Sequence, residues 1–168
     1  MEKGLTASET SNISCSNLEE IYSTLNEIDS LCRKASNGLD LAPEIIGSSI
    51  NDLGAVFLLR RKGLLRGFSV VHSLYPIDEA DHAALRLLLV DNKIKDQTSI
   101  FQELIKACER WAFANGRRRI FVRFSGEHTL MYEQLVNRGY KLDAVNVRMY
   151  KGLEFKENAT YMMAAWAG

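Results

Sequence analysis

The sequence has 168 residues, and its 21 Lys and Arg balance its 21 Asp and Glu, so the formal net charge is zero. A protein that binds nucleic acid or an anionic membrane usually has an excess of positive charge, which this sequence lacks, so we expect neither partner. A length of this size predicts one domain with a substantial core, and the composition is that of a globular protein. The three cysteines are odd in number and widely spaced, and the polar N-terminus lacks a secretory apolar segment. We therefore expect reduced thiols in a cytoplasmic protein, and no metal site, because no CxxC or His/Cys cluster occurs.

The first part of the chain predicts a flexible segment followed by a helix. Residues 1–15 are rich in Ser, Thr and Asn, and we expect them to be flexible. A capping box formed by Ser16 and Glu19 begins the helix, and Asn37-Gly38 ends it. Between them, apolar residues recur at helical spacing and predict one buried face.

A short helix and a strand hairpin are predicted next. Pro43 opens the helix, which runs to about residue 50 and directs three isoleucines toward the core: Ile45, Ile46 and Ile50. Apolar residues then predict strands at 55–60 and 64–73. The turn at 61–63 contains Lys-Gly, which is typical of a hairpin.

The centre of the chain predicts a strand–helix–strand unit. Residues 83–90 form a buried strand, and after a polar loop an amphipathic helix begins near Ser99, where Ser99 and Gln102 make a second capping box. The helix ends at Asn115-Gly116, and a strand follows at 120–124. Two buried strands that bracket a helix imply a parallel pair with a right-handed connection. The loop before such a helix often holds an anion, because four helix N–H groups point into it.

The last part predicts a helix at about 127–137, a strand at about 144–151 and an apolar tail at 156–168. The tail is too short to span a bilayer. Its composition favours a docking segment or an oligomer contact, such as a homodimer, over a membrane anchor. The expected organisation is thus a flexible N-terminus, a single domain at 16–155, and the tail.

Four local strings resemble the GNAT superfamily of N-acetyltransferases in their order and spacing. Leu65-Arg66-Gly67-Phe68 resembles the family's hairpin strand, and residues 85–90 resemble its fourth strand. The remaining strings resemble its central helix and its closing segment: Leu104-Ile105 with Trp111-Ala112 and Asn115-Gly116, and residues 132–140 with 147–153. The resemblance covers roughly residues 53–153. It implies an α/β fold (α+β with a mixed sheet) in the order helix, helix, strand hairpin, strand, helix, strand, helix, strand, with the central sheet splayed at the fourth strand.

The resemblance also implies acetyl-CoA or another acyl-CoA as co-substrate, without a metal. The backbone of the fourth strand pairs with the pantetheine, and the loop after it receives the pyrophosphate. The implied cofactor-binding residues are Leu88, Leu89, Val90, Lys93, Lys95, Gln97, Thr98, Ser99 and Ile100. The family's R/Q-x-x-G-x-G/A signature falls on Asp96, Ser99 and Phe101, so its cation and both glycines are replaced. Lys93 and Lys95 then supply positive charge; alternatively, they and Ser99 form a solvated loop with an ordinary helix cap.

Two side chains are candidate catalytic groups. Tyr132 lies one helical turn before Leu135, the position where the family often has a tyrosine acid, and it either protonates the leaving thiolate or simply packs on the helix. His82, near the start of the fourth strand, either accepts the proton of an amine substrate or is an ordinary surface histidine. Cys108 lies on the apolar face of the central helix, so we expect it in the core rather than acting as a nucleophile.

The sequence therefore predicts an acyl-CoA-dependent N-acyltransferase, in the first instance an acetyltransferase. It would move an acyl group to a small-molecule or protein amine by direct attack. Two alternatives stay open. The lost glycines favour a GNAT-fold protein without catalytic activity that acts as a binding or regulatory module. An acyl-carrier-protein donor, whose phosphopantetheine arm is shorter than coenzyme A, would relax the need for a pyrophosphate loop.

Overall fold

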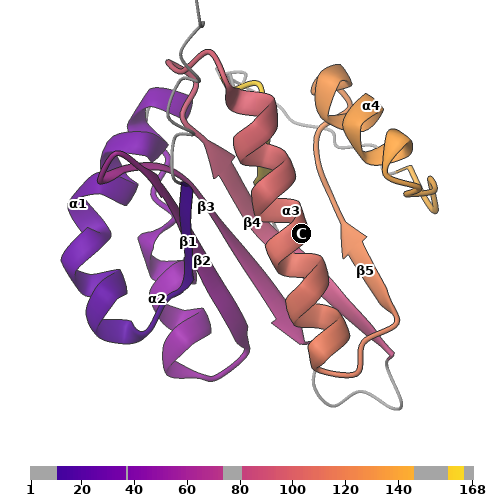
Figure 1. The fold of residues 1–168 in the computed structure, drawn as a ribbon, viewed down its shortest axis with the longest axis horizontal. Coiled ribbons are helices and arrows are strands. Elements are labelled where there is room, and N and C mark those ends of the chain that lie inside the picture. Colours follow the sequence, from indigo (N-terminus) through magenta and orange to yellow (C-terminus); the bar gives the residue numbers. More distant parts are fainter. Residues whose placement is uncertain (1–10, 37, 74–80, 146–158, 165–168) are drawn as a thin grey trace, which may run out of the picture.

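The computed structural model describes residues 11–36, 38–73, 81–145 and 159–164 and forms a mixed sheet with helices on both faces (Figure 1). In chain order the elements are β1 (Ser11–Cys15), α1 (Leu18–Ala35), α2 (Ala42–Ile50), β2 (Gly54–Arg61), β3 (Leu64–Ser73), β4 (His82–Val90), α3 (Gln97–Ala114), β5 (Arg119–Val122), α4 (Thr129–Asn137) and β6 (Met162–Ala164). The sheet order is β1-β2-β3-β4-β5, and β6 also pairs with β4. Only β4 and β5 pair in parallel among these strands. The predicted α/β fold with a mixed sheet is confirmed.

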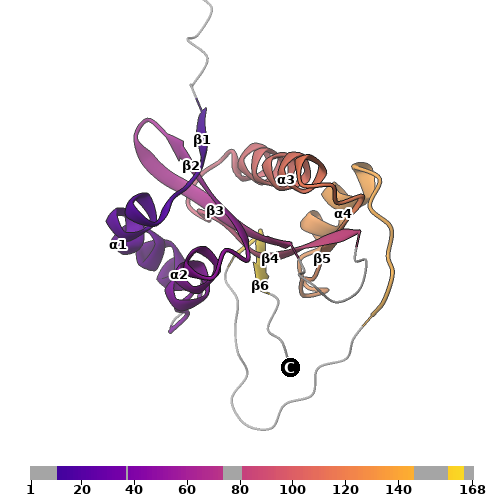
Figure 2. The same ribbon diagram turned by 90° about the horizontal axis from the view of Figure 1, so that it is seen from below.

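Two apolar layers hold the sheet between its helices. Helices α1 and α2 cover one face, and α3 and α4 cover the other (Figure 2). Alternate residues of β4 enter opposite layers: Leu87 and Leu89 pack on the α1 side, and Leu88 and Val90 pack on the α3 side. This period of two is the pattern of a strand buried on both faces. Strand β4 is therefore the structural centre of the domain.

The β2–β3 hairpin has the turn that its sequence predicts. Lys62 and Gly63 both have positive φ, 53° and 78°. Two such residues form the turn whose twist matches that of the flanking strands, and glycine at the second position adopts this conformation without steric cost.

The termini of several elements differ from the sequence-based predictions. Ser11–Cys15, expected to belong to the flexible N-terminus, instead forms β1, which pairs with β2 along five residues. The N-cap of α1 is Asn17 rather than Ser16, because the Asn17 side chain accepts a hydrogen bond from the Glu20 amide at 2.9 Å. In α2, Ile45 is buried as predicted, whereas Ile50 is 58% exposed because it ends the helix on the solvent side. The strand predicted from residue 120 is shorter and starts at Arg119, and the helix predicted from residue 127 starts at Thr129.

One predicted strand falls largely outside the described residues. Of the strand predicted at 144–151, the structure describes only Ala144 and Val145, which are in irregular conformation.

Part of the apolar tail is a strand of the sheet. Met162–Ala164 pairs with β4, and Tyr161, Met162 and Met163 are at most 2% exposed. These three residues dock within their own chain. Among the described residues, no helix is both long and apolar enough to cross a membrane.

Candidate functional site

The outer edge of β4 is divided between two strands. Its first half, from His82 to Leu85, pairs in parallel with β5. Strand β5 ends at Val122, and beyond that point β4 and β5 no longer pair, which is the predicted splay at the fourth strand (Figure 1). The second half of β4 pairs with β6 instead, and the Val90 amide donates to the Tyr161 carbonyl at 3.2 Å. The edge that the resemblance assigns to the pantetheine is thus covered by residues of the same chain.

A hydrogen-bonded loop connects β4 to α3. Asp91 is 3% exposed, pairs with Arg66 at 2.9 Å and accepts the Lys93 amide at 3.1 Å. The Gln97 side chain donates to the carbonyls of Asn92 and Ile94 at 3.2 and 3.1 Å. The Arg66–Asp91 pair holds the loop against β3, and the Gln97 bonds join the loop to the first residue of α3.

The N-terminus of α3 has no side-chain cap. The helix begins at Gln97, two residues before the predicted Ser99, and its N-cap residue Asp96 makes no capping hydrogen bond with its side chain. The predicted capping box is therefore wrong. The first four N–H groups of a helix have no partner within the helix and carry a partial positive charge, which suits an anion.

Ser99 does not cap the helix because Arg61 binds its hydroxyl. The Arg61 guanidinium donates to Ser99 Oγ at 2.8 Å and to Glu103 at 2.7 Å, and it also pairs with Asp96. Arg61, at the end of β2, was expected only as part of a charged hairpin turn. It brings a guanidinium to the α3 N-terminus, in addition to the loop residues Lys93 and Lys95, and it pairs with the acid at the family's cation position.

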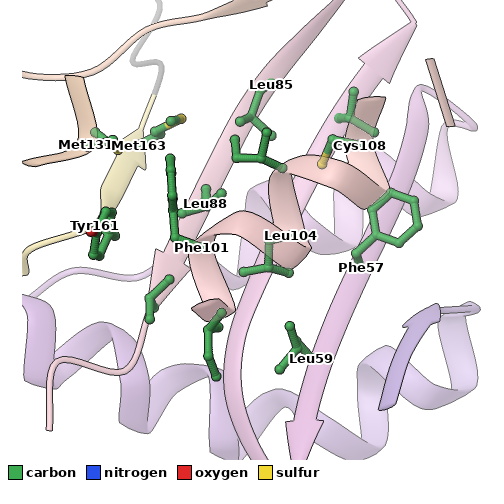
Figure 3. Packing of buried hydrophobic residues seen from close by; sticks show 14 of the residues in the cluster. Phe57, Leu59, Leu85, Leu88, Phe101, Leu104, Cys108, Met131, Tyr161 and Met163 are labelled. Atoms are coloured by element: carbon green, nitrogen blue, oxygen red, sulfur yellow. The ribbon is translucent and has the colours of Figure 1, made fainter. Parts of the chain in front are cut away.

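Thr98 faces the other side of the helix start, toward β6. Its hydroxyl lies 2.8 Å from the Tyr161 hydroxyl. The Tyr161 ring stacks on Phe101, with the ring centroids 4.6 Å apart. Figure 3 shows Tyr161 and Met163 packed between Leu88, Phe101 and Met131. Phe101 stands where the family has its last glycine, and its side chain belongs to the core.

The structure brings most of the predicted cofactor-binding residues together. Strand β4 supplies Leu88, Leu89 and Val90, all buried, and the loop and helix that follow supply Lys93, Lys95, Gln97, Thr98, Ser99 and Ile100. Lys93 and Lys95 are exposed. Ile100 is buried in the core, and its amide donates to the Asp96 carbonyl at 3.4 Å as the first hydrogen bond of the helix. In this conformation β6 occupies the edge of β4 that the resemblance assigns to the pantetheine.

The two candidate catalytic residues lie in different places. Tyr132 is on α4, 45% exposed, next to Met131, which packs near Met163 (Figure 3). His82 is at the opposite end of β4 from the α3 N-terminus, and at about 3.3 Å per residue it lies roughly 26 Å from Val90. There its ring meets the edge of Phe121 and its Nδ1 lies 4.0 Å from Asp81. The structure does not bring His82 to the loop.

The cysteines are not part of this site. Cys108 is fully buried, and burial raises the pKa of its thiol to about 12, so its predicted place in the core is confirmed. All three cysteines are free. Within the described ranges, no group of three or more His, Cys, Asp or Glu could hold a metal ion.

Sequence reasoning missed three contributors to the site: Arg61, the Arg66–Asp91 pair and Tyr161. Arg66 lies on β3 and Asp91 directly follows β4, so their contact depends on the register of the β3–β4 pair. The only sequence signal for Tyr161 was the apolar run from Tyr161 to Met163, which indicates a docking segment without naming its partner.

Comparison with known proteins supports the fold. Neither a protein-family model nor a curated protein matches the sequence. Among solved structures, the chain is similar to the aminoglycoside N-acetyltransferase AAC(6')-Iy in complex with CoA, with a TM-score of 0.65, 18% identity, and 88% of this chain and 98% of that chain covered. It is also similar to the aminoglycoside acetyltransferase meta-AAC0020 from an uncultured soil metagenomic sample, in complex with sisomicin, with a TM-score of 0.66, 15% identity, and 86% and 97% covered.

A third similar structure acts on a different kind of acceptor. It is the ribosomal-protein-alanine N-acetyltransferase of Brucella melitensis biovar Abortus 2308, with a TM-score of 0.63, 11% identity, and 85% of this chain and 100% of that chain covered. The chain therefore has the fold of N-acetyltransferases, and the fold expected from the resemblance to the GNAT superfamily is confirmed.

Proposed function

We propose that this chain is an acyl-CoA-dependent N-acyltransferase that uses acetyl-CoA or another acyl-CoA. One observation carries the proposal: β4 parts from β5 and leads into an uncapped helix N-terminus, in a fold shared with N-acetyltransferases, one of them solved with CoA. A strand edge offers backbone groups to the amides of a pantetheine arm, and the helix N-terminus offers N–H groups to a pyrophosphate.

Each part of the proposed site has a role that its chemistry supports. The backbone of residues 88–90 would pair with the arm, and the amides of residues 97–99 would receive the pyrophosphate, because the Ile100 amide already donates to the Asp96 carbonyl. Lys93 and Lys95 would add positive charge from the loop. An amine held beside the thioester attacks the acyl carbon, the C–S bond breaks, and the nitrogen releases its extra proton to water. The thiolate takes a proton; Tyr132 is our candidate for that donor, and it regains a proton from water. We leave His82 outside the site because of its distance along β4.

The acceptor is proposed to be a primary amine on a small molecule or a protein. The similar structures include one solved with the aminoglycoside sisomicin and one whose name specifies a ribosomal-protein alanine. An aminoglycoside and a peptide with an N-terminal alanine are therefore the first acceptors to test.

The test is calorimetric titration of the full chain with acetyl-CoA and with free CoA. Lys95→Glu should weaken binding by about two- to tenfold, since it reverses a charge near the proposed pyrophosphate. Lys106→Glu is the matched control, because it makes the same charge change on an exposed residue more than two turns further along α3. Transfer to each amine is then measured through the release of the free thiol of CoA. Tyr132→Phe should lower the rate constant of transfer more than it changes the binding of acetyl-CoA.

A second function is favoured by a specific observation. Because β6 covers the β4 edge, the fold can serve as a binding or regulatory module without catalysis. If neither the wild type nor a variant whose β6 no longer pairs with β4 binds acetyl-CoA at millimolar concentration, the acyltransferase function is contradicted and the binding module is favoured. Acyl transfer from a carrier protein, without transfer from CoA, would instead identify the carrier-protein donor. A homodimer contact through the tail remains a prediction, and it would need tail residues other than the buried Tyr161, Met162 and Met163.

A further inference from the structure

Residues 159–164 contact β4 and α3 as a peptide ligand contacts a sheet edge. Met163 pairs with Leu88 and Met162 with Leu89, and the Val90 amide donates to the Tyr161 carbonyl. Because bonded pairs alternate along an antiparallel ladder, the bond at Val90 makes Leu88–Met163 the next bonded pair. The segment therefore takes up the outward backbone groups of β4 at two successive positions.

Side chains anchor the same segment on both faces of the sheet. Tyr161 and Met163 enter the layer under α3, and Met162 enters the layer under α1. At the helix start, the Tyr161 hydroxyl meets the Thr98 hydroxyl, so the segment reaches the first turn of α3. One short strand thus touches both parts of the site proposed for acyl-CoA: the β4 edge and the α3 N-terminus.

The attachment is short in comparison with the rest of the sheet. Strand β6 has three residues, whereas β2, β3 and β4 have eight to ten. Among the described strands, β6 pairs with β4 alone, so its release would break neither the hairpin nor the β3–β4 pairing. The cost of release is the exposure of Tyr161, Met162 and Met163, which are at most 2% exposed when β6 is docked.

We propose that residues 159–164 are a ligand of the chain's own acyl-CoA site, so that docking of β6 and binding of acyl-CoA exclude each other. This inference rests on the proposed function. A backbone N–H or C=O on the outer edge of β4 pairs with β6 or with the pantetheine, but not with both. The apparent dissociation constant for acyl-CoA is then the intrinsic constant divided by the fraction of molecules in which β6 is released.

Three variants of the full chain test the competition. Tyr161→Phe removes the hydroxyl that meets Thr98 and keeps the ring stacked on Phe101. Met163→Pro removes the amide that the ladder needs at Leu88. Met163→Leu is the matched control, because it keeps both the amide and a side chain of similar size.

Binding of acetyl-CoA is measured by calorimetry, and strand docking by amide hydrogen exchange. Tyr161→Phe should tighten binding about two- to tenfold, the range that corresponds to one net hydrogen bond. Met163→Pro should tighten it further, and Met163→Leu should leave it unchanged. In the wild type, saturating acetyl-CoA should speed exchange at Met163 while the Leu88 and Val90 amides stay protected, because the ligand replaces the strand.

The failures of the two proposals are distinguishable. If acetyl-CoA binds while Met163 stays protected, or binds equally to all variants, the competition is refuted and the acyl-CoA site stands. If acetyl-CoA fails to bind Met163→Pro although Leu88 and Val90 exchange freely, the acyl-CoA site is refuted and the competition falls with it. Tyr161→Phe keeps this test available if the proline variant does not fold.

Discussion

Replacing Gly67 by alanine should destabilise the domain, because α3 packs closely over β3 at this residue. A Cβ added at Gly67 would lie 2.8 Å from the Leu89 carbonyl oxygen, 3.0 Å from Leu104 Cδ1 and 3.1 Å from Ile100 Cγ2. The carbonyl belongs to the β3–β4 ladder, and the two side chains are fully buried, so none of the three atoms can move freely. Overpacking of this kind costs about 1–3 kcal/mol. For a chain of this length, the loss corresponds to a fall in Tm of about 2–12 °C.

Two further glycines complete the experiment. Gly47 lies inside α2, and a Cβ there would meet no atom within 4 Å, so Gly47→Ala should stabilise the helix by about 0.5–1 kcal/mol. At Gly54 a Cβ would lie 1.9 Å from the Val71 carbonyl oxygen, so Gly54→Ala should be the most damaging of the three. Thermal unfolding followed by circular dichroism, with urea titration for the free energy of unfolding, gives the order. A Gly67→Ala protein as stable as the wild type would refute the close packing of α3 on β3.

Two more predictions concern buried titratable groups. Burial raises the pKa of Cys32 to about 11 and of Cys108 to about 12, whereas Cys15 is exposed. An aromatic disulfide reagent at pH 8 should therefore label only Cys15 in the native protein and all three thiols after denaturation; rapid labelling of Cys108 in the native state would contradict its burial. Burial also lowers the pKa of His72, whose Nε2 lies 2.7 Å from Ser48 Oγ, so the unfolded chain takes up this proton first as the pH falls. This part of the stability is complete above about pH 6.5 and is lost below it. Between pH 7.5 and 5.5 the free energy of unfolding should fall more for the wild type than for His72→Gln, and equal falls would show that His72 does not contribute.

Local sequence patterns predicted the fold well where the pattern was long. The apolar stripes of α1 and α3 each extend over several turns, and the Lys62-Gly63 turn lies between two apolar runs, so tertiary contacts had little to alter. Strand β1 was missed because Ser11–Cys15 carries only one branched apolar residue, Ile13. It becomes a strand by pairing with the edge of β2, and a sequence does not display the partner that an edge strand will meet.

The site was predicted less completely, because its contacts join residues far apart in the chain. Ser99 followed by Gln102 has the sequence of a helix cap, but the guanidinium of Arg61, 38 residues earlier, binds the hydroxyl. Asp96 replaces the cation of the family's signature, and the same guanidinium pairs with it. The strand that covers the β4 edge is β6, which lies after β4 in the sequence, whereas Arg61 lies before it. No pattern within β4 itself indicates this pairing.

Because β4 pairs with both β5 and β6, its outer edge is completed only after the ribosome has synthesised residues near the end of the sequence. Thr98 and its partner Tyr161 are 63 residues apart, so at 5–20 residues per second the ribosome needs roughly 3–13 seconds to make the second after the first. Helices and hairpins form in microseconds. During this interval the nascent domain presents the outer backbone of Leu88 and Val90 as an unpaired edge, the type of surface on which other strands add and aggregation begins.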